Sequence, residues 1–117
     1  MPDARSAFVA TGPSVFVPAH STALNGVLVT PTDTSPALHG SQFRVVSAST
    51  NTIVHFAYAA TNTDAANAAV AATNGTTQSS IPIHANTTII ITAPRGMYWT
   101  GNSTVNTNLF ITPGYGL

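Results

Sequence analysis

Four histidines are the side chains of this chain that can bind a metal ion or titrate near neutral pH. They are His20, His39, His55 and His84. Neutral imidazole is a common zinc ligand, and three histidines from separate strands can hold a catalytic zinc ion. These spacings match no metal-binding motif, and only three carboxylates are present to orient such ligands. We therefore expect exposed or singly hydrogen-bonded histidines, with no metal and no other cofactor bound.

Acid–base and nucleophilic catalysis also lack their usual residues. Glycoside hydrolysis uses two carboxylates across a cleft, whereas Asp3, Asp33 and Asp64 fall in terminal or turn-like segments suited to capping. A serine nucleophile needs a neighbouring base that a third group orients, and neither a Gly-x-Ser-x-Gly motif nor a phosphate-binding loop occurs. Chance proximity of a serine and a histidine is the only support for catalysis, so the sequence predicts no enzyme and no catalytic residue.

Aromatic side chains remain as candidates for recognition, either as a sugar-stacking platform or as a protein hot spot. Core packing is the favoured interpretation of three of them, Phe16, Phe56 and Trp99. Phe110 differs because it alternates with asparagines on the strand face opposite Val105, Leu109 and Ile111, so we expect it to point away from the core. An exposed aromatic in that place is best explained by a partner. The predicted protein interface consists of Phe8, Val9, Phe110 and Tyr115.

Short runs of β-branched and aromatic residues predict the strands that would position these side chains. Asn25-Gly26 is a hairpin signal between two such runs, 15–18 and 27–30. The runs 42–46 and 53–58 are interpreted as a second hairpin, and the apolar residues on both faces of the latter are typical of a central strand. Further strands are predicted at 81–84, 87–93, 97–100 and 105–111.

Proline, glycine and alanine mark the breaks between these strands. Pro82 places its strand at a sheet edge or a bulge, and Pro94-Arg95-Gly96 predicts a turn. Residues 64–75 are the one stretch with a helical pattern, because Asp64 can cap an alanine-rich run and Gly75 can close it. An irregular excursion between strands is equally compatible with that segment.

About eight short strands separated by turn residues are typical of a β-sandwich or a small barrel. The prediction is one all-β domain over residues 14–117, a single β-sandwich with at most one short helix, for which a jelly roll is one fitting topology. Residues 1–13 show no clear period and contain two prolines and a glycine, so they are interpreted as an extended N-terminal arm. Within that arm, Phe8 and Val9 would need something to cover them.

The composition favours a protein that works in an assembly. Only 5% of the 117 residues are charged and the formal net charge is +0, whereas an ordinary soluble domain has about 25% charged residues. Identical copies therefore do not repel one another, and we expect a homo-oligomer.

The same composition argues against two classes of partner. Three scattered arginines cannot supply the several phosphate contacts that nucleic-acid binding needs. The N-terminus has no basic segment followed by an apolar stretch, and no apolar run of about 18 residues occurs. We expect no direct nucleic-acid binding, no secretion signal and no membrane span.

Several short motifs resemble those of small virion proteins of tailed bacteriophages. They are Phe43-Arg44-Val45-Val46, Thr52-Ile53-Val54-His55-Phe56-Ala57, Ile81-Pro82-Ile83, Pro94-Arg95-Gly96 and the ending 109–117. The ending is the most specific, because a strand runs there into Thr-Pro-Gly-Tyr-Gly-Leu. Residues 42–117 take part, whereas residues 1–41 contribute little and the alanine-rich segment 64–75 is longer than expected for the type.

The resemblance implies a structural protein of the virion, a decoration or cement protein that binds the major capsid protein on the outside of the capsid and stabilises the shell. It also implies a trimer, because decoration proteins often sit at local three-fold points of capsids, although a dimer fits the composition equally well. Two alternatives stay open. One is a carbohydrate-binding or receptor-binding β-sandwich module of a head fibre or tail, and the other is a neck or tail connector component.

Overall fold

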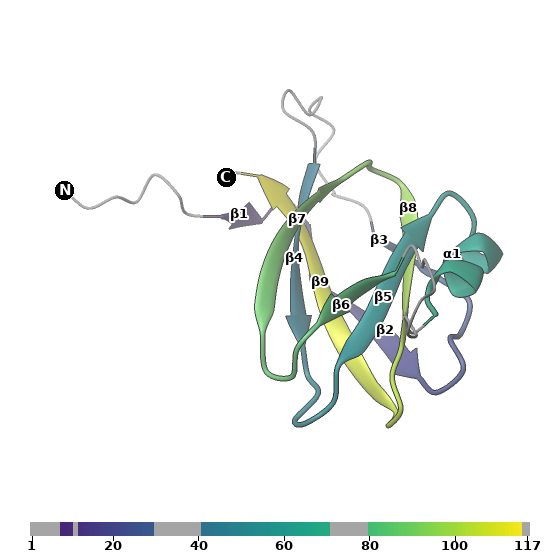
Figure 1. The fold of residues 1–117 in the computed structure, drawn as a ribbon. Coiled ribbons are helices and arrows are strands. Elements are labelled where there is room, and N and C mark those ends of the chain that lie inside the picture. The colour runs from purple at the N-terminus through teal and green to yellow at the C-terminus, as the bar shows by residue number, and fades with distance from the viewer. Residues whose placement is uncertain (1–7, 11, 30–40, 71–79, 116–117) are drawn as a thin grey trace.

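The structure, a computed structural model, describes residues 8–10, 12–29, 41–70 and 80–115, which form a mostly-β domain with one short helix (Figure 1). The strands in these residues are β1 (Val9–Ala10), β2 (Val15–His20), β3 (Val27–Val29), β4 (Ser41–Ser47), β5 (Val54–Ala59), β6 (Ile81–Ile83), β7 (Thr88–Ala93), β8 (Met97–Asn102) and β9 (Thr107–Tyr115). The helix α1 (Asn62–Ala68) lies between β5 and β6 in the sequence.

Most of the strands follow one another in a single mixed sheet, in the order β6-β5-β8-β2-β9-β4-β7, with β1 beside β9 and β3 beside β8. The pairing of β2 with β8 is parallel and joins Ala19 to Gly101 and His20 to Asn102. The other pairings are antiparallel. The sheet curls into a nearly closed, barrel-like shape with β6 and β7 at its two margins.

The predicted β-sandwich therefore holds only in its coarser form, a mostly-β domain with one short helix. The strand β2 explains why two separate layers do not form. It pairs with β9 from Val15 to Ala19 and reaches β8 at Ala19 and His20. Because one strand bonds to both sides in this way, the sheet runs continuously from one half of the domain to the other.

Both predicted hairpins are wrong, although the strands themselves form. β2 pairs with β8 and β9, whereas β3 pairs with β8, so the two strands that flank Asn25-Gly26 do not bond to each other. Likewise β4 pairs with β7 and β9, and β5 pairs with β6 and β8. β2 and β3 thus both lie beside β8 without bonding to each other, whereas β4 and β5 lie in different parts of the sheet.

Gly26 has a role in packing that differs from the predicted turn. Its backbone N–H donates a hydrogen bond to the Asn62 carbonyl at 2.9 Å. A Cβ at this position would lie 2.8 Å from Tyr98 Cβ and 2.9 Å from Ala65 Cβ, closer than side-chain carbons can approach. Glycine is required here because α1, β8 and the chain before β3 meet at one point.

The core lies inside the curled sheet and is centred on Trp99, which is fully buried. The Trp99 ring lies 5.0 Å from Phe43, 6.0 Å from Phe56 and 4.8 Å from Tyr58, measured between ring centroids. These contacts join β4, β5 and β8 across the interior. The predictions that Phe56 and Trp99 belong to the core are confirmed.

Two predicted core-facing positions are wrong. Phe16 is 58% exposed because Val17 and Ala19 take the inward positions of β2, and alternation leaves Phe16 on the other face. Val105 is also exposed, since it precedes the start of β9 and does not share the strand's alternation. By contrast, Leu109 and Ile111 are buried as predicted.

A helix forms where one interpretation of residues 64–75 predicted it, but its first and last residues differ from the predicted ones. The helix α1 begins two residues earlier, and its N-cap is Thr61, whose side chain accepts a hydrogen bond from the Asp64 N–H at 3.2 Å. Asp64 lies in the first turn, where a negative charge is favourable, instead of at the cap. The helix ends at Ala68 with Ala69 as its C-cap, so the predicted continuation through residues 69–70 is wrong, and Gly75 falls in 71–79, outside the described residues.

Two local predictions about breaks in the sheet are confirmed. Pro82 lies in β6, which is a margin of the sheet, where the missing N–H costs no ladder hydrogen bond. Gly96 has a φ of 76° in the turn between β7 and β8, a conformation that glycine adopts without steric cost.

Candidate functional site

The outer face of β2 and β9 carries two exposed aromatic rings side by side. Phe16 and Phe110 are directly opposite each other in the antiparallel pair. Their ring centroids are 5.9 Å apart, with an angle of 79° between the ring planes, which is the edge-to-face arrangement that aromatic pairs favour. Phe16 is 58% exposed and Phe110 is 40% exposed. Phe110 thus points away from the core, as its alternation predicts.

The apolar surface continues onto β4. Val46 lies directly opposite Phe110 on the other side of β9, and it is half-buried. Phe16, Phe110 and Val46 therefore form a row across β2, β9 and β4 on the side away from the core, and we call this row the aromatic row. None of the three side chains carries a charge. A partner could bury this surface without separating any ion from water.

The N-terminal segment reaches the same outer face beside the aromatic row. The Cζ atom of Arg44 lies 5.5 Å from the centroid of the half-buried Phe8 ring, within the range of a cation–π contact. Val9 and Ala10 pair through their backbones with Tyr115 and Gly114 as β1 and β9. The side chains of Val9 and Tyr115 lie outside the described part of the structure.

Of the four predicted interface residues, Phe8 and Phe110 therefore share one face of the sheet. Sequence reasoning missed Phe16 and Val46. The signal for Phe16 was its position between Val15 and Val17, which gives the strand two apolar faces. Which of these faces would be buried could not be read from the strand alone.

The histidines in the described residues are dispersed along the outer side of β2, β5 and β6. His20 and His55 both lie opposite Asn102, one on either side of β8, and His84 follows β6. His39 falls outside the described residues. Within the part of the chain that the structure describes, no group of three or more His, Cys, Asp or Glu side chains is close enough to hold a metal ion.

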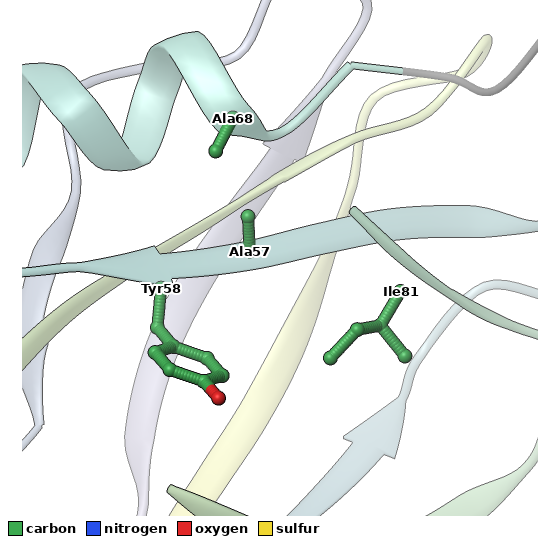
Figure 2. A pocket seen from close by; sticks show the side chains of 4 residues that line it. All are labelled: Ala57, Tyr58, Ala68 and Ile81. Atoms are coloured by element: carbon green, nitrogen blue, oxygen red, sulfur yellow. The ribbon is translucent and has the colours of Figure 1, made fainter. Parts of the chain in front are cut away.

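A small pocket of about 270 Å³ lies where α1, β5 and β6 meet. Figure 2 shows the Ala57 side chain pointing toward Ala68 of α1, whereas Tyr58 points the opposite way, to the side where Ile81 lies. The Tyr58 hydroxyl is the one polar side-chain group that these four residues bring to the pocket. Three of these four lining residues are apolar, so Tyr58 supplies their one side-chain hydrogen-bonding group.

Comparison with protein-family models, with curated proteins and with solved structures finds no match to this chain. Among the described residues, the single short helix falls well below the length needed to cross a membrane. The aromatic row is therefore the candidate functional site that the geometry itself supplies.

Proposed function

We propose that this chain is a capsid decoration protein of a tailed bacteriophage, a homo-oligomer that binds the major capsid protein on the outside of the virion and stabilises the shell. The observation that carries the proposal is the uncovered Phe16–Phe110 pair on a domain whose core is already complete around Trp99. Large exposed aromatics of this kind mark interaction surfaces. The short motifs that resemble small virion proteins supply the kind of partner.

Docking through the aromatic row would be apolar in character. Full burial of an exposed phenylalanine side chain contributes about 1.5–3 kcal/mol. Phe16 and Phe110 are already partly buried, so docking would gain a fraction of this from each ring. The row has no charge to be screened, and the whole chain has only six charged residues. Binding to the shell should therefore persist in high salt, where exposed ionic contacts are weakened.

The geometry favours this function over a glycan-binding module. Sugar rings stack on flat aromatic faces, whereas the planes of Phe16 and Phe110 meet at 79° and do not form one continuous platform. A neck or tail connector would use the same apolar surface at another place in the particle. Cryo-electron microscopy of the virion separates these cases, because decoration protein covers the capsid surface and connector protein does not.

The experiment that tests the proposal adds purified variants to capsids that lack the protein and measures the bound fraction. Phe110→Asp should abolish binding because it places a charge in the aromatic row. Ile53→Asp is the matched control, since Ile53 is 43% exposed but lies in the segment before β5 and is not part of the aromatic row. Capsids that bind Phe110→Asp as tightly as the unaltered protein would contradict the proposal.

A further inference from the structure

The two margins of the sheet differ sharply in how they are protected against strand addition. β6 has three residues and carries Pro82 in its centre, so it offers little backbone for pairing. β7 has six residues, Thr-Ile-Ile-Ile-Thr-Ala, with no proline and no charge. In the part of the chain that the structure describes, β7 pairs with β4 alone. Figure 1 shows it at one margin of the sheet.

The register shows which backbone groups of β7 face away from β4. Ser47 donates its N–H to the Thr87 carbonyl at 2.9 Å, so this directly opposite pair is a hydrogen-bonded one. Hydrogen-bonded and non-bonded pairs alternate along an antiparallel ladder. Ile89, Ile91 and Ala93 therefore direct their N–H and C=O groups toward β4. The backbone groups directed to the open margin belong to Thr88, Ile90 and Thr92.

The amino-acid sequence of β7 is symmetric about Ile90, the middle one of these three residues. Thr88-Ile89-Ile90-Ile91-Thr92 reads the same in both directions, with Ile90 at its centre. If two copies pair antiparallel about Ile90, each Ile90 faces its equivalent, each Thr88 faces a Thr92, and each Ile89 faces an Ile91. The three residues with outward backbone groups are also symmetric about Ile90, so all three pairs are hydrogen-bonded pairs.

We propose that two copies of this chain associate by antiparallel pairing of β7 with β7, centred on Ile90, to form a two-fold dimer with one continuous sheet. A second copy is the occupant that the palindrome favours, because an unrelated peptide would gain nothing from this symmetry. The contact also places no charged side chain of β7 opposite another. The half-buried Ile89 and Ile91, which pack against the edge of the core, would become more fully covered.

The nearest charge does not oppose this contact. Arg44 lies opposite Ile90 on β4, so the two copies of Arg44 would be separated by the two β7 strands. Three strand spacings amount to roughly 14 Å, which exceeds the screening length of about 8 Å at physiological ionic strength. Repulsion between them is therefore weak.

The proposed dimer gives a specific form to the homo-oligomer of the proposed function, whereas capsid binding through the aromatic row does not depend on it. A two-fold axis perpendicular to the paired β7 strands and midway between the two Ile90 residues keeps the outer faces of these two strands on the same side. Each aromatic row includes Val46 on β4, the strand next to β7, so the dimer would carry two rows and could engage a surface at two points, which raises the overall affinity. The dimer would replace the trimer that the resemblance implies.

Hydrogen exchange of the purified full chain provides a test with an internal control. In the dimer, the Thr88, Ile90 and Thr92 amides should be protected, and dilution to the monomer should abolish this protection. The Ile89 and Ile91 amides bond to β4 and should stay protected at every concentration. Sedimentation equilibrium should give twice the chain mass at high concentration.

Ile90→Pro should abolish the dimer, because proline removes the central N–H and its ring blocks the approaching strand. Ile90→Val keeps the backbone donor and should remain dimeric. Protection of the Ile89 amide shows whether each variant is folded, and Ile90→Lys offers a second disruption without a backbone constraint.

Phe110→Asp should lose capsid binding but keep the dimer, so failure of one proposal is distinct from failure of the other. A chain that stays monomeric at high concentration, or an oligomer whose Ile90 amide exchanges freely, would overturn the dimer.

Discussion

The outer face of the sheet has two regions with opposite character. Over β5 and β8, the helix α1 packs against the sheet (Figure 1). Gly26 fits there between Tyr98 and Ala65, and the buried residues of this region include the small Ala57, Ala65 and Thr100. Over β2, β9 and β4, the residues of the aromatic row are large and two of them are exposed. The covered region thus includes close contacts between small residues, whereas the aromatic row keeps large side chains exposed.

The residues of the covered region pack within the folded domain. The residues of the aromatic row have side chains that the folded domain leaves partly exposed. Under α1, backbone and side chains approach so closely that a single added carbon at Gly26 would collide with its neighbours. In the aromatic row, Phe16 and Phe110 contact each other edge to face and retain much of their exposed surface. We infer that the first region contributes to stability and the second to association, and mutations can test this division.

The largest effect on the free energy of unfolding is expected in the core, which lies beneath both regions of the sheet. Trp99→Ala should lower the free energy of unfolding by about 3–5 kcal/mol, because it removes a buried ring that contacts Phe43, Phe56 and Tyr58. Urea denaturation followed by circular dichroism measures this loss. A loss below about 1 kcal/mol would mean that the core is not centred on Trp99.

The next largest effect is expected under the helix. Gly26→Ala should cost about 1–3 kcal/mol, since the new carbon would lie against Cβ atoms of Tyr98 and Ala65 that cannot rotate away. Thermal unfolding compares this variant with Phe110→Ala, which removes many more atoms. If the glycine variant is the more stable of the two, the distinction between the covered and the open region fails.

A smaller effect is expected at the start of α1. Thr61→Ala removes the side-chain acceptor for the Asp64 N–H and should cost about 1 kcal/mol. Thr61→Ser retains the hydroxyl and serves as the control. Equal stability of the two variants in urea would show that this cap does not stabilise the helix α1 that packs over β5 and β8.

The smallest effect on the fold is expected in the aromatic row. Phe16→Ala and Phe110→Ala should each change the free energy of unfolding by less than about 1 kcal/mol, because their rings are exposed and only their mutual contact is lost. Both variants should nevertheless bind capsids more weakly. A double-mutant cycle isolates the ring–ring contact, and a loss of stability comparable to that of Trp99→Ala would place the row in the core.

Features that depend on neighbouring residues could be predicted from the sequence alone. Alternation placed Phe110 on the face of its strand that points away from the core, and the special backbone preferences of Pro82 and Gly96 located an edge and a turn. A local pattern also indicated the short helix, as one of two interpretations of residues 64–75. Its start did not, because Thr61 and Asp64 are both good caps and packing of α1 on the sheet selects between them.

Tertiary structure alone decided which strands pair and which face of β2 is buried. Alternation states that Phe16 and Val17 lie on opposite faces, but both are apolar, so only the location of the core around Trp99 determines which one is covered. Asn25-Gly26 permits a tight turn, yet β3 pairs with β8, more than sixty residues away. Strand partners depend on the total packing of distant segments, which no local propensity specifies, whereas the composition that favours assembly is a property of the chain before it folds.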